Sequence, residues 1–128
     1  MTNIMHTEKK FRERRKHQRH EVKQGAYVAT QPTATHLGPI LDISMGGLLF
    51  QYTFSNIFDN KFSENSIFIG SFECYIGNIK FKTIDDVNDA NSPLSKSMET
   101  RKRRIKFEDL SALQRLELQC FIYDNSSK

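Results

Sequence analysis

The sequence lacks several features that mark common classes of protein. It has no tryptophan and only two cysteines, Cys74 and Cys120, which form neither a C-x-x-C pair nor a zinc-binding spacing. No apolar run approaches the ~20 residues that cross a bilayer. Residues 1–10 are polar and lack the apolar core of a secretion signal. We therefore expect a cytoplasmic protein with no membrane span, whose two thiols are reduced and buried.

Signatures of catalysis are also missing. Ser44 does not stand in G-x-S-x-G, and the chain has no P-loop, no H-E-x-x-H and no glycine-rich dinucleotide fingerprint. His17, His20 and His36 are conceivable metal ligands, but the first two stand in an arginine-rich run. Solvent exposure or stacking on a base is the better interpretation of these imidazoles. The sequence thus predicts no enzyme, no metal site and no cofactor.

The residues that are present favour β structure and an anionic partner. A chain of 128 residues has room for one domain with one modest core, and ten Phe with four Tyr favour strands. Lys and Arg exceed Asp and Glu by 19 to 15, which suggests an anionic partner. The first twenty or so positions are dominated by charged residues, most of them basic. This stretch has too few apolar residues to fold alone, so we expect a flexible arm, with residues 1–13 as its tail, that orders around a ligand.

Six β-prone segments follow the arm, separated by turn signals and polar stretches. They are residues 25–30, 37–43, 48–52, 66–72, 75–84 and 101–107. In the last of them Ile105 and Phe107 alternate with charged residues and are expected to face inward. Residues 85–100 are rich in Asp, Asn, Ser and Pro and predict a long exposed loop.

The C-terminal segment has the pattern of an amphipathic helix. Ser111 and Gln114 fit a capping box, in which each side chain satisfies a backbone N–H of the other residue. The apolar residues that we expect on the buried face are Leu113, Leu116, Cys120 and Phe121. Several short strands followed by one such helix indicate a small barrel that the helix closes or plugs.

Three arginines near the N-terminus form the first candidate binding element. Arg14, Arg15 and Arg19 carry planar guanidinium groups, which bind phosphates bidentately, stack on bases and match O6 and N7 of guanine. In so basic a chain, an R-x-x-x-R spacing taken alone is explained by default as a solvated charged tail or a generic attraction to nucleic acid.

The second candidate element is the segment Asp42-Ile43-Ser44-Met45-Gly46-Gly47, between two predicted strands. The Asp42 carboxylate can accept hydrogen bonds from N1–H and the exocyclic amine of guanine, and Ser44 can donate to a phosphate or cap the turn. Gly46 and Gly47 signal a turn, and Gly47 allows the backbone to approach a ligand. Taken alone, this motif is better explained by local turn hydrogen bonds.

Together, and in this order, the two elements resemble the PilZ family. In that family R-x-x-x-R, here Arg15–Arg19, precedes the first barrel strand, and (D/N)-x-S-x-x-G, here Asp42–Gly47, follows it. The resemblance covers residues 14–123 and leaves 124–128 as a C-terminal tail. The usual proline after the arginine motif is missing, and the polar segment before the last strand is unusually long. The resemblance implies a small six-stranded antiparallel β-barrel with a C-terminal α-helix.

The resemblance also implies a ligand, because PilZ domains are receptors for the bacterial second messenger cyclic di-GMP. Carried over by position, the arginines clamp guanine and phosphate, and the second motif reads a guanine edge. Arg14 adds a guanidinium that suggests a self-stacked pair of ligands. The residues expected to bind the ligand are Arg14, Arg15, Arg19, Asp42, Ser44, Gly46 and Gly47. The ordered arm would then signal to an unidentified protein partner in motility, exopolysaccharide or secretion control.

Two alternatives stay open beside this hypothesis. The first is a PilZ-fold adaptor that acts through protein contacts without a ligand, and the intact motif residues argue against it. The second is a small-barrel nucleic-acid-binding protein that uses the same arm and exposed aromatic residues. Steep salt dependence on a polynucleotide, without discrimination for the cyclic dinucleotide, would favour the second alternative.

Overall fold

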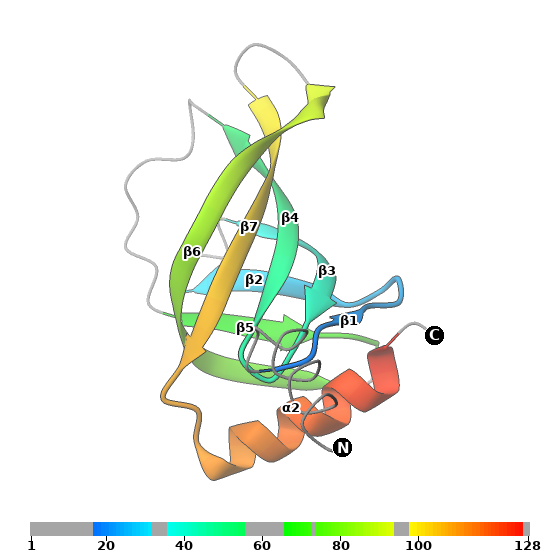
Figure 1. Cartoon of the computed structure of the whole chain (residues 1–128), viewed down its shortest axis with the longest axis vertical. Helices are drawn as coiled ribbons and strands as arrows, with labels where there is room; N and C mark the ends of the chain where they lie inside the picture. The colour runs from blue at the N-terminus through cyan, green and yellow to red at the C-terminus, as the bar shows by residue number, and fades with distance from the viewer. Residues whose placement is uncertain (1–16, 32–35, 56–65, 73, 94–97, 127–128) are drawn as a thin grey trace, which may run out of the picture.

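The computed structural model describes residues 17–31, 36–55, 66–72, 74–93 and 98–126, and within them seven strands and one helix (Figure 1). In chain order the elements are β1 (His20–Glu21), β2 (Tyr27–Gln31), β3 (Leu37–Ile43), β4 (Gly47–Ser55), β5 (Ser66–Gly70), β6 (Tyr75–Pro93), β7 (Met98–Glu108) and α2 (Ala112–Asn125). The helix lies across one end of the strands, and the long β6–β7 hairpin extends from the opposite end.

Six of the strands form a closed antiparallel ring. The hydrogen-bonded order is β2, β3, β4, β7, β6, β5 and back to β2, so each of these strands has two neighbours. Closure removes the unpaired edges that an open sheet would present. The predicted six-stranded antiparallel barrel with a C-terminal helix is therefore confirmed.

The short strand β1 lies outside the ring and joins the arm to it. β3 pairs with β2 through residues 37–39, and near its C-terminal end it pairs with β1 through Asp42 and Ile43. Immediately after β1, Val22 forms a bridge with Ser126, and the amide of Lys23 donates to the carbonyl of Asn125 at 2.8 Å. Residues 20 and 21, the end of the predicted flexible arm, are thus paired with β3, and the two residues after them are bound to the C-terminal end of α2.

The long exposed loop predicted for residues 85–100 is wrong. β6 continues to Pro93 and β7 begins at Met98, so most of this segment is a two-stranded hairpin. The contacts of Asp86 give a physical reason. Its carboxylate accepts from the Tyr52 hydroxyl of β4 and lies 3.7 Å from the Arg101 guanidinium of β7. A residue that favours turns in isolation is thus held in a strand by cross-strand contacts.

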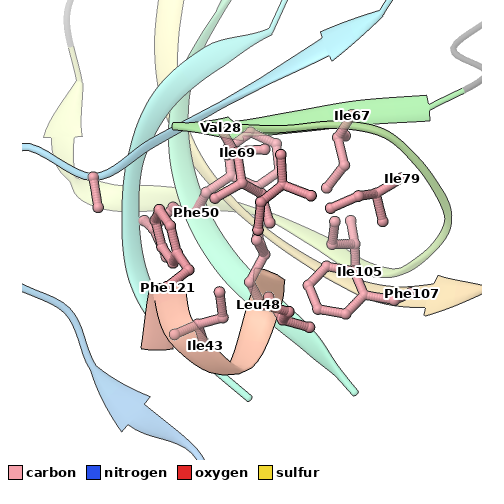
Figure 2. Close-up of a cluster of buried hydrophobic side chains, with 14 of the residues drawn as sticks. Val28, Ile43, Leu48, Phe50, Ile67, Ile69, Ile79, Ile105, Phe107 and Phe121 are labelled. Atoms are coloured by element: carbon pink, nitrogen blue, oxygen red, sulfur yellow. The ribbon is translucent and has the colours of Figure 1, made fainter. Parts of the chain in front are cut away.

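The core fills the barrel between the sheet and the helix (Figure 2). Ile105 and Phe107 of β7 are only 2% and 6% exposed, which confirms their predicted inward direction. Opposite them, Leu48 and Phe50 of β4 point inward at alternate positions, as a strand with one buried face requires. Phe121 enters the same cluster from α2, so the helix closes one end of the barrel.

The helix begins as predicted but presents a different face. Ser111 Oγ accepts from the Gln114 amide and Gln114 Oε1 accepts from the Ser111 amide, both at 3.0 Å, which confirms the capping box. The helix continues to Asn125, two residues beyond the boundary placed at residue 123. Its buried residues are Leu118, Phe121 and Ile122.

The predicted buried face is therefore wrong for three of its four members. Leu113 and Leu116 are 64% and 58% exposed, Cys120 is exposed, and only Phe121 is in the core. The Gln114 side-chain amide donates to the carbonyls of Gly77 and Asn78 at 3.1 Å, which bonds the first turn of the helix to β6 in this orientation.

The two thiols differ in their surroundings. Both cysteines are free, as expected, but Cys120 is exposed, which contradicts its predicted burial. Cys74 is partly buried and contacts the core, and this burial raises the pKa of its thiol. Within the described residues no helix has both the length and the apolar character needed to cross a membrane.

Candidate functional site

The described members of the two sequence motifs lie at one end of the barrel. Asp42 is the last residue but one of β3. Ser44 and Gly46 lie in the connection to β4, and Gly47 is the first residue of β4. β1 pairs with β3 at this point, which brings Arg19, the residue before β1, next to the connection. Arg14 and Arg15 lie outside the described residues, so their predicted contacts stay predictions.

Ser44 has a structural role in the turn. It is only 7% exposed, and its hydroxyl accepts from the Gly46 amide at 3.1 Å and donates to the Gly47 carbonyl at 3.4 Å. The Ser44 amide also donates to the Gly47 carbonyl, at 2.8 Å. These bonds close the β3–β4 connection, as the local explanation of the motif requires. Whether Ser44 also contacts a phosphate stays a prediction.

The glycine pair also has structural reasons. A Cβ on Gly47 would lie 2.1 Å from the carbonyl oxygen of Ile105 on β7, so only glycine allows the two strands to approach here. A Cβ on Gly46 would lie 2.8 Å from Cδ2 of His17, whose ring covers this position. Gly47 therefore serves strand packing first, and its predicted approach to a ligand is not tested by this geometry.

Asp42 is engaged by an arginine that the motifs do not include. Its two carboxylate oxygens accept from the two terminal nitrogens of Arg104 at 3.1 and 3.0 Å. Both side chains are 23% exposed, so the pair lies partly out of water. Leu49 of β4 pairs with Asp42 on one side and with Arg104 on the other, so all three occupy one row of the outer surface.

Arg104 also borders a small hollow of about 220 Å³ beside the β3–β4 connection. Its lining is His17, Arg19, Ser44, Gly46, Gly47, Ile84, Arg104, Ile105 and Lys106. Three cationic side chains, Arg19, Arg104 and Lys106, therefore border one concavity. Such a hollow suits an anion, because guanidinium groups make bidentate, charge-assisted hydrogen bonds to phosphate.

Arg104 and Lys106 are the site residues that the motifs missed. A usable signal was present, since inward Ile105 and Phe107 require the residues that alternate with them to face outward. The register places Lys106 beside Gly47. The outer face of β7 lies beside the β3–β4 connection, and this follows only from the order of the strands in the barrel.

A larger groove of about 1170 Å³ adjoins the hollow, and His17 and Arg19 line both. One wall is the segment around β1, with Glu21 and Lys23, and the other is the end of α2. The residues of that second wall are Gln119, Ile122, Tyr123, Asp124 and Ser126, and Met45 also lines the groove. The two concavities together lie between the arm and the helix, and their lining combines apolar surface with side chains of both charges.

A second polar cluster forms on β4, β6 and β7, among residues that do not line the hollow. The Tyr52 hydroxyl donates to Asp86 at 2.6 Å, and burial together with this hydrogen bond raises the pKa of Tyr52. Arg103, 6% exposed, donates to Thr83 and contacts His36, whose ring packs on Tyr52. His36 thus has a structural role. Among the described residues, no three His, Cys, Asp or Glu side chains are grouped as metal ligands would be.

Comparison with solved structures identifies the type of barrel. The chain is similar to the PilZ domain with c-di-GMP of YcgR from Escherichia coli, with a TM-score of 0.51 and 15% identity over 88% of this chain and 91% of that one. It is also similar to MrkH, described as a c-di-GMP-dependent transcription regulatory factor, with a TM-score of 0.52 and 16% identity over 87% of this chain. The likeness covers 50% of MrkH, so the chain spans about half the length of that protein.

These likenesses establish a PilZ-like fold and confirm the resemblance drawn from the two motifs. Neither of the two proteins is described by an enzymatic activity. No protein-family model and no curated protein matches the sequence.

Proposed function

We propose that this chain is a receptor for cyclic di-GMP. The observation that carries the proposal is the hollow at the β3–β4 connection, where Arg19 and the second motif meet two further cations on a PilZ-like barrel. A cyclic dinucleotide has two phosphates for these cations and two guanines with donor-rich edges. The printed descriptions of both structural neighbours, which name c-di-GMP, support the same ligand class.

The adjoining groove suggests how ligand binding changes the protein surface that a partner contacts. Because β1 and the end of α2 form its two walls, a ligand placed there contacts both segments at once. We propose that the arm, including Arg14 and Arg15, closes over the ligand and changes the surface next to α2. A partner protein in motility, exopolysaccharide or secretion control would read that surface. The ordering of the arm reduces the net affinity below what the contacts alone would give.

Titration calorimetry tests the ligand. The full chain is expected to bind cyclic di-GMP with a micromolar or lower Kd, and Arg19→Ala is expected to weaken binding by about tenfold or more, the scale of a lost charge-assisted hydrogen bond. Arg115→Ala is the matched control, because Arg115 is exposed on α2 and lines neither concavity.

GTP and a short oligonucleotide are titrated in parallel. Absence of heat and of competition with labelled cyclic di-GMP would disprove the proposal. Equal binding of the oligonucleotide, with a steep dependence on salt, would identify a nucleic-acid-binding barrel instead.

A further inference from the structure

The ion pair between Asp42 and Arg104 occupies the atoms that the proposed ligand needs. The Asp42 carboxylate is predicted to accept two parallel hydrogen bonds from guanine. In the structure both of its oxygens already accept from Arg104, at 3.1 and 3.0 Å.

Arginine and guanine compete for the same edge of a carboxylate. A guanidinium presents two parallel N–H donors, and guanine presents N1–H and N2–H side by side in the same way. Each pair of donors needs both oxygens from the open side of the carboxyl group. Asp42 can satisfy one such partner at a time, so guanine can bind to it only after Arg104 has left.

Arg104 has a second place to bind once it is displaced. Its side chain borders the hollow together with Arg19 and Lys106, and Lys106 lies two residues along the outer face of the same strand. Once it has left Asp42, the Arg104 guanidinium lies beside Lys106 at the hollow, which is unfavourable unless an anion lies between the two cations. A phosphate of the ligand provides that charge.

We infer that Arg104 is a ligand-binding residue held by Asp42 in the free protein, and that cyclic di-GMP exchanges the two partners: guanine takes Asp42 and a phosphate takes Arg104. This inference rests on the proposed function. It requires guanine and phosphate in the same ligand, because a phosphate alone leaves Asp42 without its partner and a guanine alone leaves Arg104 without one. The pair thus makes the site selective against cyclic dinucleotides with other bases.

Cyclic di-AMP is the probe that separates the two halves of the exchange. It carries the same phosphates, but adenine lacks N1–H and the 2-amino group, so it cannot displace Arg104 from Asp42. In Asp42→Asn the charge that holds Arg104 is gone and the guanidinium is available to phosphate. This variant is expected to bind cyclic di-AMP about tenfold more tightly than wild type does, and cyclic di-GMP more weakly.

The double variant Asp42→Asn with Arg104→Met is expected to lose the gain for cyclic di-AMP, because the released cation is absent. Asp42→Asn with Arg104→Lys is expected to keep most of it, since lysine retains the charge. A loss of folded structure would lower the affinity for both ligands together, whereas the exchange moves them in opposite directions. Thermal unfolding of each variant is measured alongside.

The result that would overturn the inference is an affinity for cyclic di-AMP that Asp42→Asn leaves unchanged or undetectable, or a gain that survives Arg104→Met. Failure of the proposed function is a separate result, because it is seen in the wild-type protein alone as an absence of cyclic di-GMP binding.

Discussion

At the scale of single residues, the two glycines of the β3–β4 connection differ in what surrounds them. A Cβ on Gly47 would meet backbone, the carbonyl oxygen of Ile105, at 2.1 Å, and a strand paired on both sides cannot shift cheaply. A Cβ on Gly46 would meet only the edge of the His17 ring at 2.8 Å. An exposed side chain such as His17 can rotate away.

Gly47→Ala is therefore expected to destabilise the fold by about 1–3 kcal/mol, the range for overpacking a well-packed position. Gly46→Ala, the matched control one residue away, is expected to change the free energy of unfolding by less than about 1 kcal/mol, because only a side chain has to move. Urea denaturation followed by circular dichroism measures both. Equal losses from the two substitutions would contradict the role given to the Ile105 carbonyl.

The residues of the site were predictable to different degrees. The second motif places Asp42 and Gly47 near each other, because a turn between two strands keeps its own residues together, and their contact with a ligand stays a prediction. The Asp42–Arg104 pair was not predictable, since it joins β3 to β7 across β4 and depends on the order of strands in the ring. Spacing along the chain carries no information about that order.

At the scale of elements, α2 carries two apolar stripes and buries only one of them. Leu118, Phe121 and Ile122 enter the core, whereas Leu113 and Leu116 remain on the outer side. Both stripes have helical spacing, so the sequence predicts a helix and its capped start but leaves its rotation open. The rotation follows from the fold, in which Leu118, Phe121 and Ile122 face the core and Gln114 bonds to the β6 backbone.

Leu118→Ala is expected to lower the free energy of unfolding by about 2–5 kcal/mol, because it leaves a cavity at a fully buried position. Leu116→Ala, on the same helix and with the same change of residue type, is expected to change it by no more than about 0.5 kcal/mol. Chemical denaturation of the two variants compares them. A larger cost for Leu116→Ala would mean that the helix is rotated toward the face first predicted from the sequence.

At the scale of the whole molecule, segments from the two ends of the described chain form one groove. The residues around β1 provide one wall and the end of α2 the other, although about a hundred positions separate them in the sequence. The barrel holds both walls in place, because β1 pairs with β3 and Phe121 is anchored in the core. A ligand between them links the two ends of the fold.

Hydrogen exchange is expected to show this link. Saturating cyclic di-GMP should slow exchange of backbone amides in residues 17–23 and in residues 119–126 together, because both walls contact the ligand and their local opening is suppressed. Amides in the distal half of the β6–β7 hairpin, which line neither concavity, provide the internal comparison. Protection confined to one wall would place the ligand in the small hollow alone.

The bridge between Val22 and Ser126 has a consequence for how this fold can be used by longer chains. With these two residues paired, and Lys23 bonded to Asn125 at 2.8 Å, the polypeptide enters and leaves the barrel at almost the same place. A domain of this kind can be inserted into a surface loop of a host protein without separating the two halves of that loop. A force acting on that host loop would then act directly on both walls of the groove.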